Sequence, residues 1–338
     1  MREIRIGIVG VGYWGKNVLK SFASVPGARV TAVCDMDPGR LAAAKESYPA
    51  VATVTSLAEL LSNPEVDAVA VVTPAEDHRA VAEACLRAGK DVFVEKPLAN
   101  SSDDAEALVR AADSAGRTLM VGHLFLFDPA VRALLDSVRS GLVGDVRYVQ
   151  GVRTSMGGTA RLDTNIVSDA LIHDAYILRS LFGMVPTRVL AIGESYLSPG
   201  VEDIAFVAFD FGAGRLAHVY AGWYALEKAR RLTVVGSDRI IAYDDLAHHR
   251  VTVYDRGYEP SGEMDGQGRP RWRWRDGEGR ALELEAGQPL ALECRHFVEC
   301  VATGARPLAD GAAGIEAVRI IEACQRSLRT GNTWVEVA

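Results

Sequence analysis

The chain lacks any hydrophobic run that could cross a membrane, and it lacks an excess of positive charge. Its 338 residues contain no apolar stretch that approaches the ~18 residues of a membrane helix. Its 37 lysines and arginines are outnumbered by 44 aspartates and glutamates, which gives a net charge of −7. A general nucleic-acid binder needs the opposite balance. We therefore expect no membrane partner and no nucleic-acid partner.

Cysteine is scarce, and its spacing does not match the usual patterns of metal ligands. The five cysteines are an odd number, which does not suggest a fully paired disulfide framework. Cys34 and Cys85 lie in apolar runs, where a buried, reduced thiol is expected. The N-terminus leads directly into an apolar strand without a signal-peptide pattern. These features predict a cytoplasmic protein without a metal centre.

Residues 1–122 have the pattern of a domain in which strands and helices alternate. Strands that are apolar throughout and separated by helices are typical of a parallel sheet covered on both faces. The expected strands are 4–9, 30–34, 68–72, 92–94 and 119–121. The pattern predicts an α/β domain over 1–122.

Residues 123–338 have a different character. Strand-like runs between about 187 and 255 follow one another with short turns that contain glycine. This order favours a large, mostly antiparallel open sheet. Helices are expected near 129–140, 166–182, 290–303 and 312–330. The second domain, over 123–338, is therefore predicted to be α+β.

The stretch GVGYWGKN places Gly10, Gly12 and Gly15 directly after the first expected strand, and Asp35 follows 20 residues beyond Gly15. This is the spacing of a Rossmann turn, in which glycines allow the backbone to approach a pyrophosphate and an acid binds the ribose hydroxyls. The carboxylate of Asp35 would repel a 2′-phosphate. The pattern predicts an NAD-binding Rossmann domain with a preference for NAD over NADP. The alternative is a glycine turn that binds no dinucleotide.

The stretch VFVEKPLA ends an apolar strand with Lys96. Dinucleotides lie across the carboxyl ends of such strands, so Lys96 is expected in the cofactor crevice. Pro97 restricts the backbone of Lys96 to extended conformations, and the bond between them could be cis. The chain contains only six lysines against 31 arginines. The alternative is a lysine that simply reaches water from the strand end.

These motifs together resemble the Gfo/Idh/MocA oxidoreductases. GVGYWGKN, VVTPAEDH, VEKPLA and SDALIHDAYIL occur in the order and spacing of that family. Within it, the chain most resembles the nucleotide-sugar 3-dehydrogenase branch. The resemblance implies a substrate-binding and oligomerisation role for the second domain and assembly as a homodimer or homotetramer through the outer face of its sheet. Along the cofactor it implies Tyr13, Trp14, Thr73, Pro74, His78, Glu95 and Lys96.

The resemblance also implies a second catalytic motif, formed by Asp169 and His173. Residues i and i+4 share a helix face, and alcohol oxidation needs a proton acceptor, for which histidine is suited. We assign His173 as the general base, Lys96 as the electrostatic stabiliser and proton-relay partner, and Asp169 as the residue that orients a substrate hydroxyl. The alternative for His173 is a purely structural role. Arg161 and Asn165 are further substrate-contact candidates, by comparison with the same branch.

The expected activity is NAD-dependent oxidation of a ring secondary hydroxyl, at C3, of a nucleotide-linked or aminoglycoside-type sugar. The product would be a ketosugar ready for amination. An inositol or free-sugar dehydrogenase, a non-catalytic sensor of cofactor or sugar, and a glycoside-cleaving enzyme are the alternatives. The segment RPRWRWRDG, residues 269–277, would place its tryptophans on one strand face and its arginines on the other. It predicts a stacking platform for a base or sugar; the alternative is a hairpin or a contact with another subunit.

Overall fold

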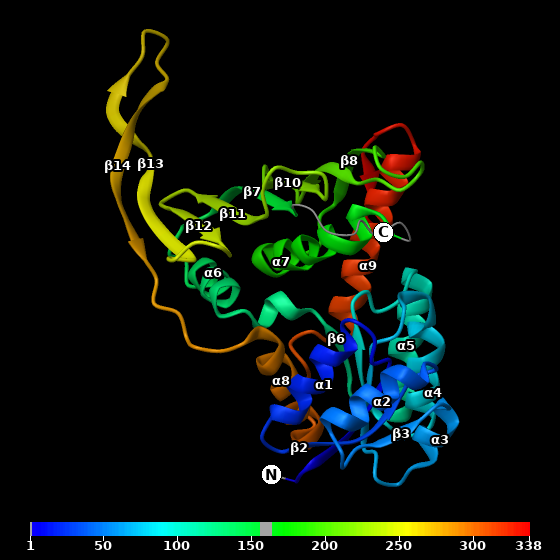
Figure 1. Ribbon diagram of the computed structural model, residues 1–338. Helices are drawn as coiled ribbons and strands as arrows, with labels where there is room; N and C mark the ends of the chain where they lie inside the picture. The colour runs from blue at the N-terminus through cyan, green and yellow to red at the C-terminus, as the bar shows by residue number, and fades with distance from the viewer. Residues whose placement is uncertain (1, 156–163) are drawn as a thin grey trace. The chain divides into compact units, whose positions relative to one another are not determined.

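The computed structural model describes residues 2–155 and 164–338 and divides the chain into two compact units (Figure 1). Unit 1 is formed by Met1–Asp128 and Gly287–Arg319, and unit 2 by Pro129–Ala286 and Ile320–Ala338. Within the described ranges, no helix is both long and apolar enough to cross a membrane.

Unit 1 contains a six-stranded parallel sheet in the order β3-β2-β1-β4-β5-β6. The strand order reverses between β1 and β4, and ligands bind α/β sheets of this kind outside the carboxyl ends of the strands at that switch point. The central strands are buried on both faces, as their continuous apolar sequences predict. The strands are β1 (Ile4–Val9), β2 (Ala28–Cys34), β3 (Ala52–Val54), β4 (Ala68–Val71), β5 (Asp91–Glu95) and β6 (Leu119–Gly122).

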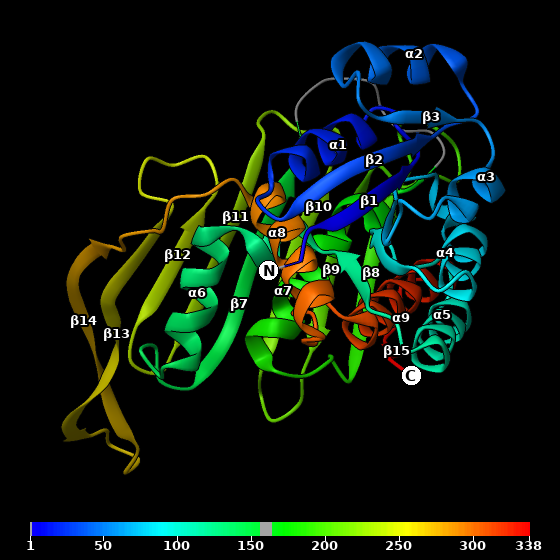
Figure 2. The same cartoon turned by 90° about the horizontal axis from the view of Figure 1, so that it is seen from below.

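Helices connect these strands and cover the sheet, and α4 and α5 lie side by side (Figure 2). On the opposite side, α8 joins α1 through Phe22, Phe93 and Phe297, whose ring centroids are 5.9 to 6.0 Å apart in edge-to-face contacts. The helices are α1 (Gly15–Ser24), α2 (Pro38–Ser47), α3 (Leu57–Ser62), α4 (His78–Arg87), α5 (Ser102–Ala115) and α8 (Pro289–Thr303), with short turns η1 (Ala75–Asp77) and η2 (Leu124–Phe127). Helix α9 (Gly311–Arg329) begins in unit 1 and ends in unit 2.

Unit 2 contains a nine-stranded sheet in the order β14-β13-β12-β11-β7-β10-β9-β8-β15. Only the β7–β10 pair among its described strands is parallel, so the predicted mostly antiparallel open sheet is confirmed. The strands are β7 (Val146–Thr154), β8 (Arg188–Glu194), β9 (Ile204–Asp210), β10 (Leu216–Gly222), β11 (Ala229–Gly236), β12 (Ile240–Asp244), β13 (Val251–Met264), β14 (Pro270–Ala281) and β15 (Val335–Glu336).

One face of the unit 2 sheet is buried under helices, and the other carries exposed apolar side chains. The covering elements are α6 (Pro129–Arg139), a π-helical turn, η3 (Val167–Leu171), and α7 (Ile172–Phe182). Along β7, Val149 points to the buried face and Tyr148 to the exposed one, as strand alternation requires. Phe206 and Tyr220 stack on the exposed face with ring centroids 5.0 Å apart. We call this the outer face.

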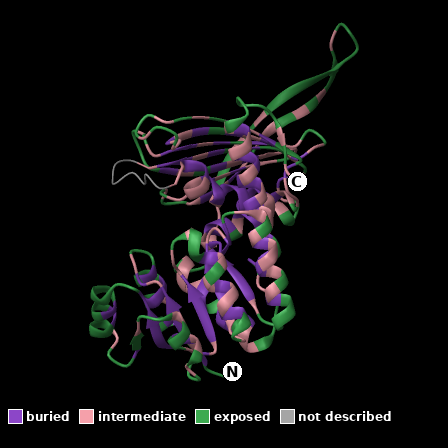
Figure 3. Ribbon diagram, turned by 90° about the vertical axis from the view of Figure 1, so that its right-hand side faces the viewer, coloured by how far each residue is buried: buried purple, intermediate pink, exposed green. Residues whose placement is uncertain are grey.

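Strands β13 and β14 continue beyond the sheet as a two-stranded arm (Figure 1). Strand β12 pairs with Val251–Tyr254, whereas the pairing with β14 continues to Met264. Most of the arm is exposed (Figure 3). Trp274 lies opposite Tyr258 with ring centroids 5.1 Å apart, and Arg273 forms an ion pair with Glu259. Residues 270–277 of the segment RPRWRWRDG thus lie in β14, one strand of a hairpin.

The compact units differ from the predicted division at residues 122 and 123. The first unit continues to Asp128, and Gly287–Arg319 returns to it from the C-terminal part of the chain. The physical reason is α8, whose apolar residues Phe297 and Val298 are buried in unit 1. An amphipathic pattern shows that a helix packs on a core, but it does not show which core.

Candidate active site

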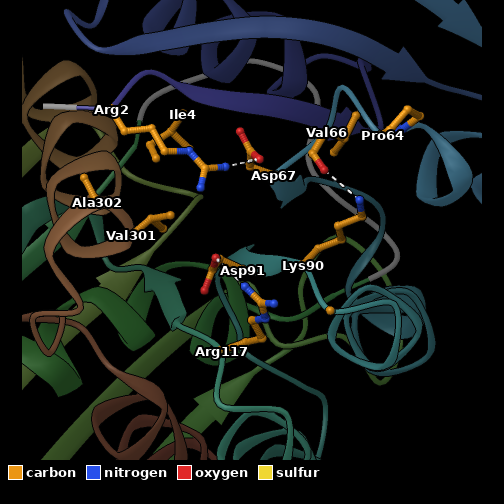
Figure 4. A pocket seen from close by; sticks show the side chains of 11 residues that line it. Arg2, Ile4, Pro64, Val66, Asp67, Lys90, Asp91, Arg117, Val301 and Ala302 are labelled. Carbon is orange, nitrogen blue, oxygen red and sulfur yellow. Dashed lines mark hydrogen bonds and ion pairs between the residues drawn. The ribbon is translucent and has the colours of Figure 1, made fainter.

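A cavity of about 390 Å³ opens at the amino ends of the unit 1 strands (Figure 4). Its charged side chains are held by one another and by the backbone: Arg2 pairs with Asp67, and Lys90 Nζ lies 2.6 Å from the Val66 carbonyl. The glycine turn and Lys96 follow the carboxyl ends of their strands. The cavity therefore lies at the wrong end of the sheet for a dinucleotide.

The glycine turn is shaped by close backbone approach. Gly10 has φ of +88°, and a Cβ there would lie 2.5 Å from the Val72 carbonyl oxygen. A Cβ at Gly15 would lie 2.1 Å from the Gly10 carbonyl oxygen. At Gly12, by contrast, the nearest atom is Arg40 Nη1 at 3.6 Å. Gly10 and Gly15 thus close the turn, while Gly12 leaves space above the start of α1 for a ligand.

Asp35 fixes the loops at the ends of β1 and β2. It is only 7% exposed, and its two oxygens accept hydrogen bonds from the backbone N–H groups of Val11 and Asp37, both at 2.9 Å. Arg40 Nη1 lies 3.6 Å from the same carboxylate. The predicted ribose-binding acid is therefore held in a fixed position beside the glycine turn. Arg40, which was not predicted as a site residue, places a cation next to it.

His78 ties two candidate loops together. Its ring nitrogens lie 2.7 Å from the Pro97 carbonyl oxygen and 3.0 Å from the Thr73 carbonyl oxygen. Burial lowers the pKa of His78, and the neutral ring can donate to only one of these carbonyls. The side chain is 1% exposed. His78 therefore joins the loops that follow β4 and β5, and its contact with a cofactor stays a prediction.

Lys96 and its neighbours follow β5. The Lys96–Pro97 peptide bond is cis, the isomer that the sequence left open. The preceding Glu95 is buried and accepts a hydrogen bond of 2.7 Å from Trp14 Nε1 at the start of α1. Glu95 and Trp14, both predicted along the cofactor, thus bind each other. Tyr13 is 91% exposed beside them.

The residues of unit 1 fit a dinucleotide. The Oγ1 atom of Thr73 is buried and has no hydrogen-bond partner among the described residues, and a buried hydroxyl of this kind normally has one. Pro74 follows it and precedes η1. Thr73, Gly12 and Asp35 all lie at the carboxyl ends of β4, β1 and β2. A bound cofactor would supply the missing partner of Thr73.

In unit 2, His173 lies in the first turn of α7, and Asp169 lies in the π-helical turn before it. His173 Nδ1 is 3.0 Å from the hydroxyl of the buried Tyr176. Both His173 and Asp169 are partly exposed. Short π-helical turns often occur at functional sites because they reposition side chains within a helix. Tyr176 was not predicted, although its i+3 spacing from His173 could have indicated it.

The other two substrate candidates have different outcomes. Asn165 accepts a hydrogen bond of 3.0 Å from the Ser168 backbone and donates one of 2.9 Å to Glu202. It therefore caps the π-helical turn that carries Asp169. Arg161 lies outside the described residues.

Beneath α7, Arg153 and Asp174 form a buried ion pair through two hydrogen bonds, which anchors the helix one residue beyond His173.

Comparison with known proteins decides the family. A model described as the oxidoreductase family with an NAD-binding Rossmann fold matches residues 4–123, and the C-terminal α/β domain of the same family matches residues 138–337. The chain belongs to the Gfo/Idh/MocA oxidoreductase family. It is therefore an NAD-dependent oxidoreductase. Within residues 2–155 and 164–338, no group of three or more His, Cys, Asp or Glu side chains is arranged to hold a metal ion.

Two relatives span nearly the whole chain. A UDP-N-acetylglucosamine 3-dehydrogenase of Acidithiobacillus ferrooxidans is 29% identical over 93% of this chain and 94% of its own length. Its solved structure has a TM-score of 0.84 at 27% identity, covering 98% of this chain and 99% of the other. A D-apiose dehydrogenase of Paraburkholderia graminis is 28% identical over 98% of this chain and 90% of its own. Both relatives are dehydrogenases of sugars.

Proposed function

We propose that this enzyme is a sugar dehydrogenase that oxidises a ring secondary hydroxyl, at C3, of a nucleotide-linked or aminoglycoside-type sugar. The observation that carries the proposal is the pair of groups at the two predicted catalytic positions. Lys96 follows β5 of the dinucleotide-binding sheet, and His173 is bound by Tyr176 on α7. Similarity over nearly the whole chain to a UDP-N-acetylglucosamine 3-dehydrogenase supports C3 and a nucleotide-linked substrate.

The residues divide the chemistry between them. Gly12, Asp35 and Thr73 would hold the dinucleotide, and a bound NAD⁺ would supply the acceptor for the hydride of the carbinol carbon. Since the hydroxyl must lose its proton as the hydride leaves, His173 takes that proton. The Lys96 ammonium stabilises the negative charge that develops on the oxygen and assists the proton transfer. Asp169, one helical turn before His173, orients a neighbouring hydroxyl of the sugar.

The reaction can be tested by incubating the purified enzyme with NAD⁺ and UDP-N-acetylglucosamine, and following the absorbance of reduced nicotinamide. Lys96→Ala, His173→Ala and the double variant test the two assignments. If both groups act on one carbinol, the double variant loses little more activity than the worse single variant. Independent, additive losses would contradict the shared role.

A second candidate is a dehydrogenase of inositol or of a free sugar. The similarity to a D-apiose dehydrogenase over nearly the whole chain favours it. The same assay with myo-inositol, D-apiose and free hexoses separates the two. A non-catalytic sensor would bind cofactor and sugar without any change in nicotinamide absorbance. The ketosugar product of the first candidate would suit a later amination step.

We further propose that the chain assembles as a homodimer or homotetramer through the outer face of unit 2. Tyr148, Ile192, Phe206 and Leu216 are all exposed there, and contiguous exposed apolar patches mark association surfaces.

The five cysteines are buried free thiols, which supports a reducing compartment such as the cytoplasm.

A further inference from the structure

Glu293 is a fully buried acid on α8, the helix that returns to unit 1 late in the chain. Its exposed fraction is 0%, and neither of its carboxyl oxygens accepts a hydrogen bond from any donor among residues 2–155 and 164–338. An ionised carboxylate without a partner is too costly to bury, so such a group binds a proton instead. Burial accordingly raises the pKa of Glu293 well above its usual range, and the nearby Glu95 raises it further.

Helix α8 runs antiparallel to the strands, because Val301 and Ala302 near its end line the cavity at their amino ends. Glu293, earlier in the helix, therefore lies toward Glu95 at the carboxyl end of β5. Phe297, one turn after Glu293, contacts Phe93 of β5 with ring centroids 5.9 Å apart. Glu293 and Phe297 share one face of the helix, and Phe93 and Glu95 share one face of the strand. A Cβ at Gly122 would lie 3.0 Å from Glu95 Oε2 and 3.1 Å from Phe93 Cζ, which confirms that those two side chains are adjacent.

The surroundings of the two acids differ in a way that decides which holds the proton. Glu95 accepts hydrogen bonds from Trp14 Nε1 at 2.7 Å and from the Lys96 backbone at 3.2 Å. The charge of Lys96 also favours its ionised form, although burial raises the pKa of Glu95 overall. On α8 itself, the neighbouring Cys294 has a pKa raised well above its usual range by burial and is a neutral thiol. The negative charge therefore rests on Glu95 and the proton on Glu293.

We propose that Glu293 is a positioning residue, and that its protonated carboxyl group donates a hydrogen bond to the Glu95 carboxylate. The shared proton holds Glu95 against Trp14 at the start of α1 and against the backbone of Lys96. It thereby fixes the glycine-turn helix and the lysine loop relative to each other inside unit 1. The effect of Glu293 on catalysis rests on the function proposed for Lys96. The presence of the proton on Glu293 does not depend on that function.

Infrared spectroscopy of protein labelled with ¹³C-glutamate tests the proton directly and needs no substrate. At pH 8 we expect the carbonyl band of one protonated carboxyl group in the wild-type protein. The band disappears in Glu293→Gln and persists in the control Glu299→Gln, which changes an exposed acid on the same helix. The proposal fails if the wild-type protein has no such band, or if the band survives in Glu293→Gln.

Kinetics and cofactor binding then test the positioning role. Glu293→Gln keeps the size and a hydrogen-bond donor, so turnover should stay within about threefold of wild type. Glu293→Leu removes the donor and should lower kcat by roughly tenfold or more with a smaller change in KM, since a misplacement of 1 Å can cost about 10²-fold. Calorimetric NADH titration and thermal unfolding show whether Glu293→Leu folds. If it folds and turns over like wild type, the positioning role is wrong.

The two proposals can fail separately. If no candidate sugar is oxidised, the infrared band and the NADH affinity of Glu293→Leu still report on the buried pair. If sugar is oxidised and the band is missing, only the role of Glu293 is overturned.

Discussion

At the scale of single residues, the chemistry of unit 1 is concentrated where strands end. Gly12, Asp35, Thr73 and Lys96 follow four different strands of one parallel sheet. At least one helix lies between each of these residues and the next along the chain. The parallel topology of the sheet brings all four to the same edge. The residues that hold them in place, His78 and Glu95, are buried beside them.

The first prediction concerns Lys96. Replacement by alanine removes the cation that stabilises the developing charge, and we expect kcat to fall by roughly 10²–10³, the usual loss for one such group. The measurement is steady-state oxidation of the best sugar substrate. Lys20→Ala, on an exposed part of α1, is the control and should behave as wild type. Unchanged turnover in Lys96→Ala would remove the catalytic assignment.

The second prediction concerns cofactor choice. Asp35→Ser removes the charge that repels a 2′-phosphate. Arg40, whose Nη1 lies 3.6 Å from the Asp35 carboxylate in the wild-type chain, then becomes available to bind that phosphate. We expect NAD⁺ affinity to fall by about tenfold, which corresponds to about 1.4 kcal/mol, and NADP⁺ affinity to rise. Calorimetric titration measures both. Adding Arg40→Ala should abolish the gain for NADP⁺, and a gain that persists would show that Arg40 has no part in it.

At the scale of elements, α8 packs against β5, the strand that leads to Lys96. It supplies Phe297 to the aromatic core of unit 1 and Glu293 to the pair with Glu95. The π-helical turn η3 has a similar importance in unit 2, because it carries Asp169 and is capped by Asn165. Aromatic packing holds α8, and the hydrogen bonds of Asn165 hold η3.

The third prediction is a pH dependence of stability that arises from α8. Because the pKa of Glu293 is raised in the folded state, folding takes up a proton at any pH above the unfolded value of about 4.3 and below the folded one. The free energy of unfolding therefore falls as pH rises through that window, by up to about 1.4 kcal/mol per pH unit. Urea unfolding at pH 5 and pH 7 measures it.

Glu293→Gln cannot take up this proton, so its stability relative to wild type should increase from pH 5 to pH 7. Glu299→Gln provides the reference, because Glu299 is exposed on the same helix. Parallel pH profiles for wild type and Glu293→Gln would contradict a buried, protonated acid.

At the scale of the whole molecule, the exposed apolar surface of unit 2 is the feature that a single chain does not explain. The outer face and the arm each present aromatic side chains to solvent. A two-stranded ribbon by itself is marginally stable in water, and the arm extends well beyond the strand β12 that supports its base. Both features are those expected of surfaces that associate with further copies of the chain.

The fourth prediction tests this association. Phe206→Asp places a charge in the outer face, next to Tyr220, and should reduce the mass measured by light scattering coupled to size exclusion. Because Phe206 is 53% exposed, the variant chain should remain folded, with a stability change within about 0.5 kcal/mol. Leu226→Asp, in an exposed loop, is the control. An unchanged mass in Phe206→Asp would exclude the outer face as the interface.

Local patterns predicted much of the fold. The five strands expected in residues 1–122 are present, because continuous apolar runs between helices have few other solutions. The short β3, whose three residues carry little apolar signal, was not predicted. The expected run of strands ended at about residue 255, whereas the structure shows that the pairing of β13 with β14 continues well beyond it. Cross-strand partners such as Tyr258 and Trp274 become visible only once the register is known.

The sequence by itself determined the glycine turn, the acid that follows it, the lysine at the end of β5 and the Asp169–His173 spacing, because these depend on short-range geometry. Only the tertiary structure decided that His78 binds two carbonyl groups, that Tyr176 binds His173, and that Glu293 lies buried beside Glu95. The physical reason is distance along the chain. Glu293 is separated from Glu95 by nearly two hundred residues. The pattern of an amphipathic helix shows which face is buried, but it does not show which core that face packs against.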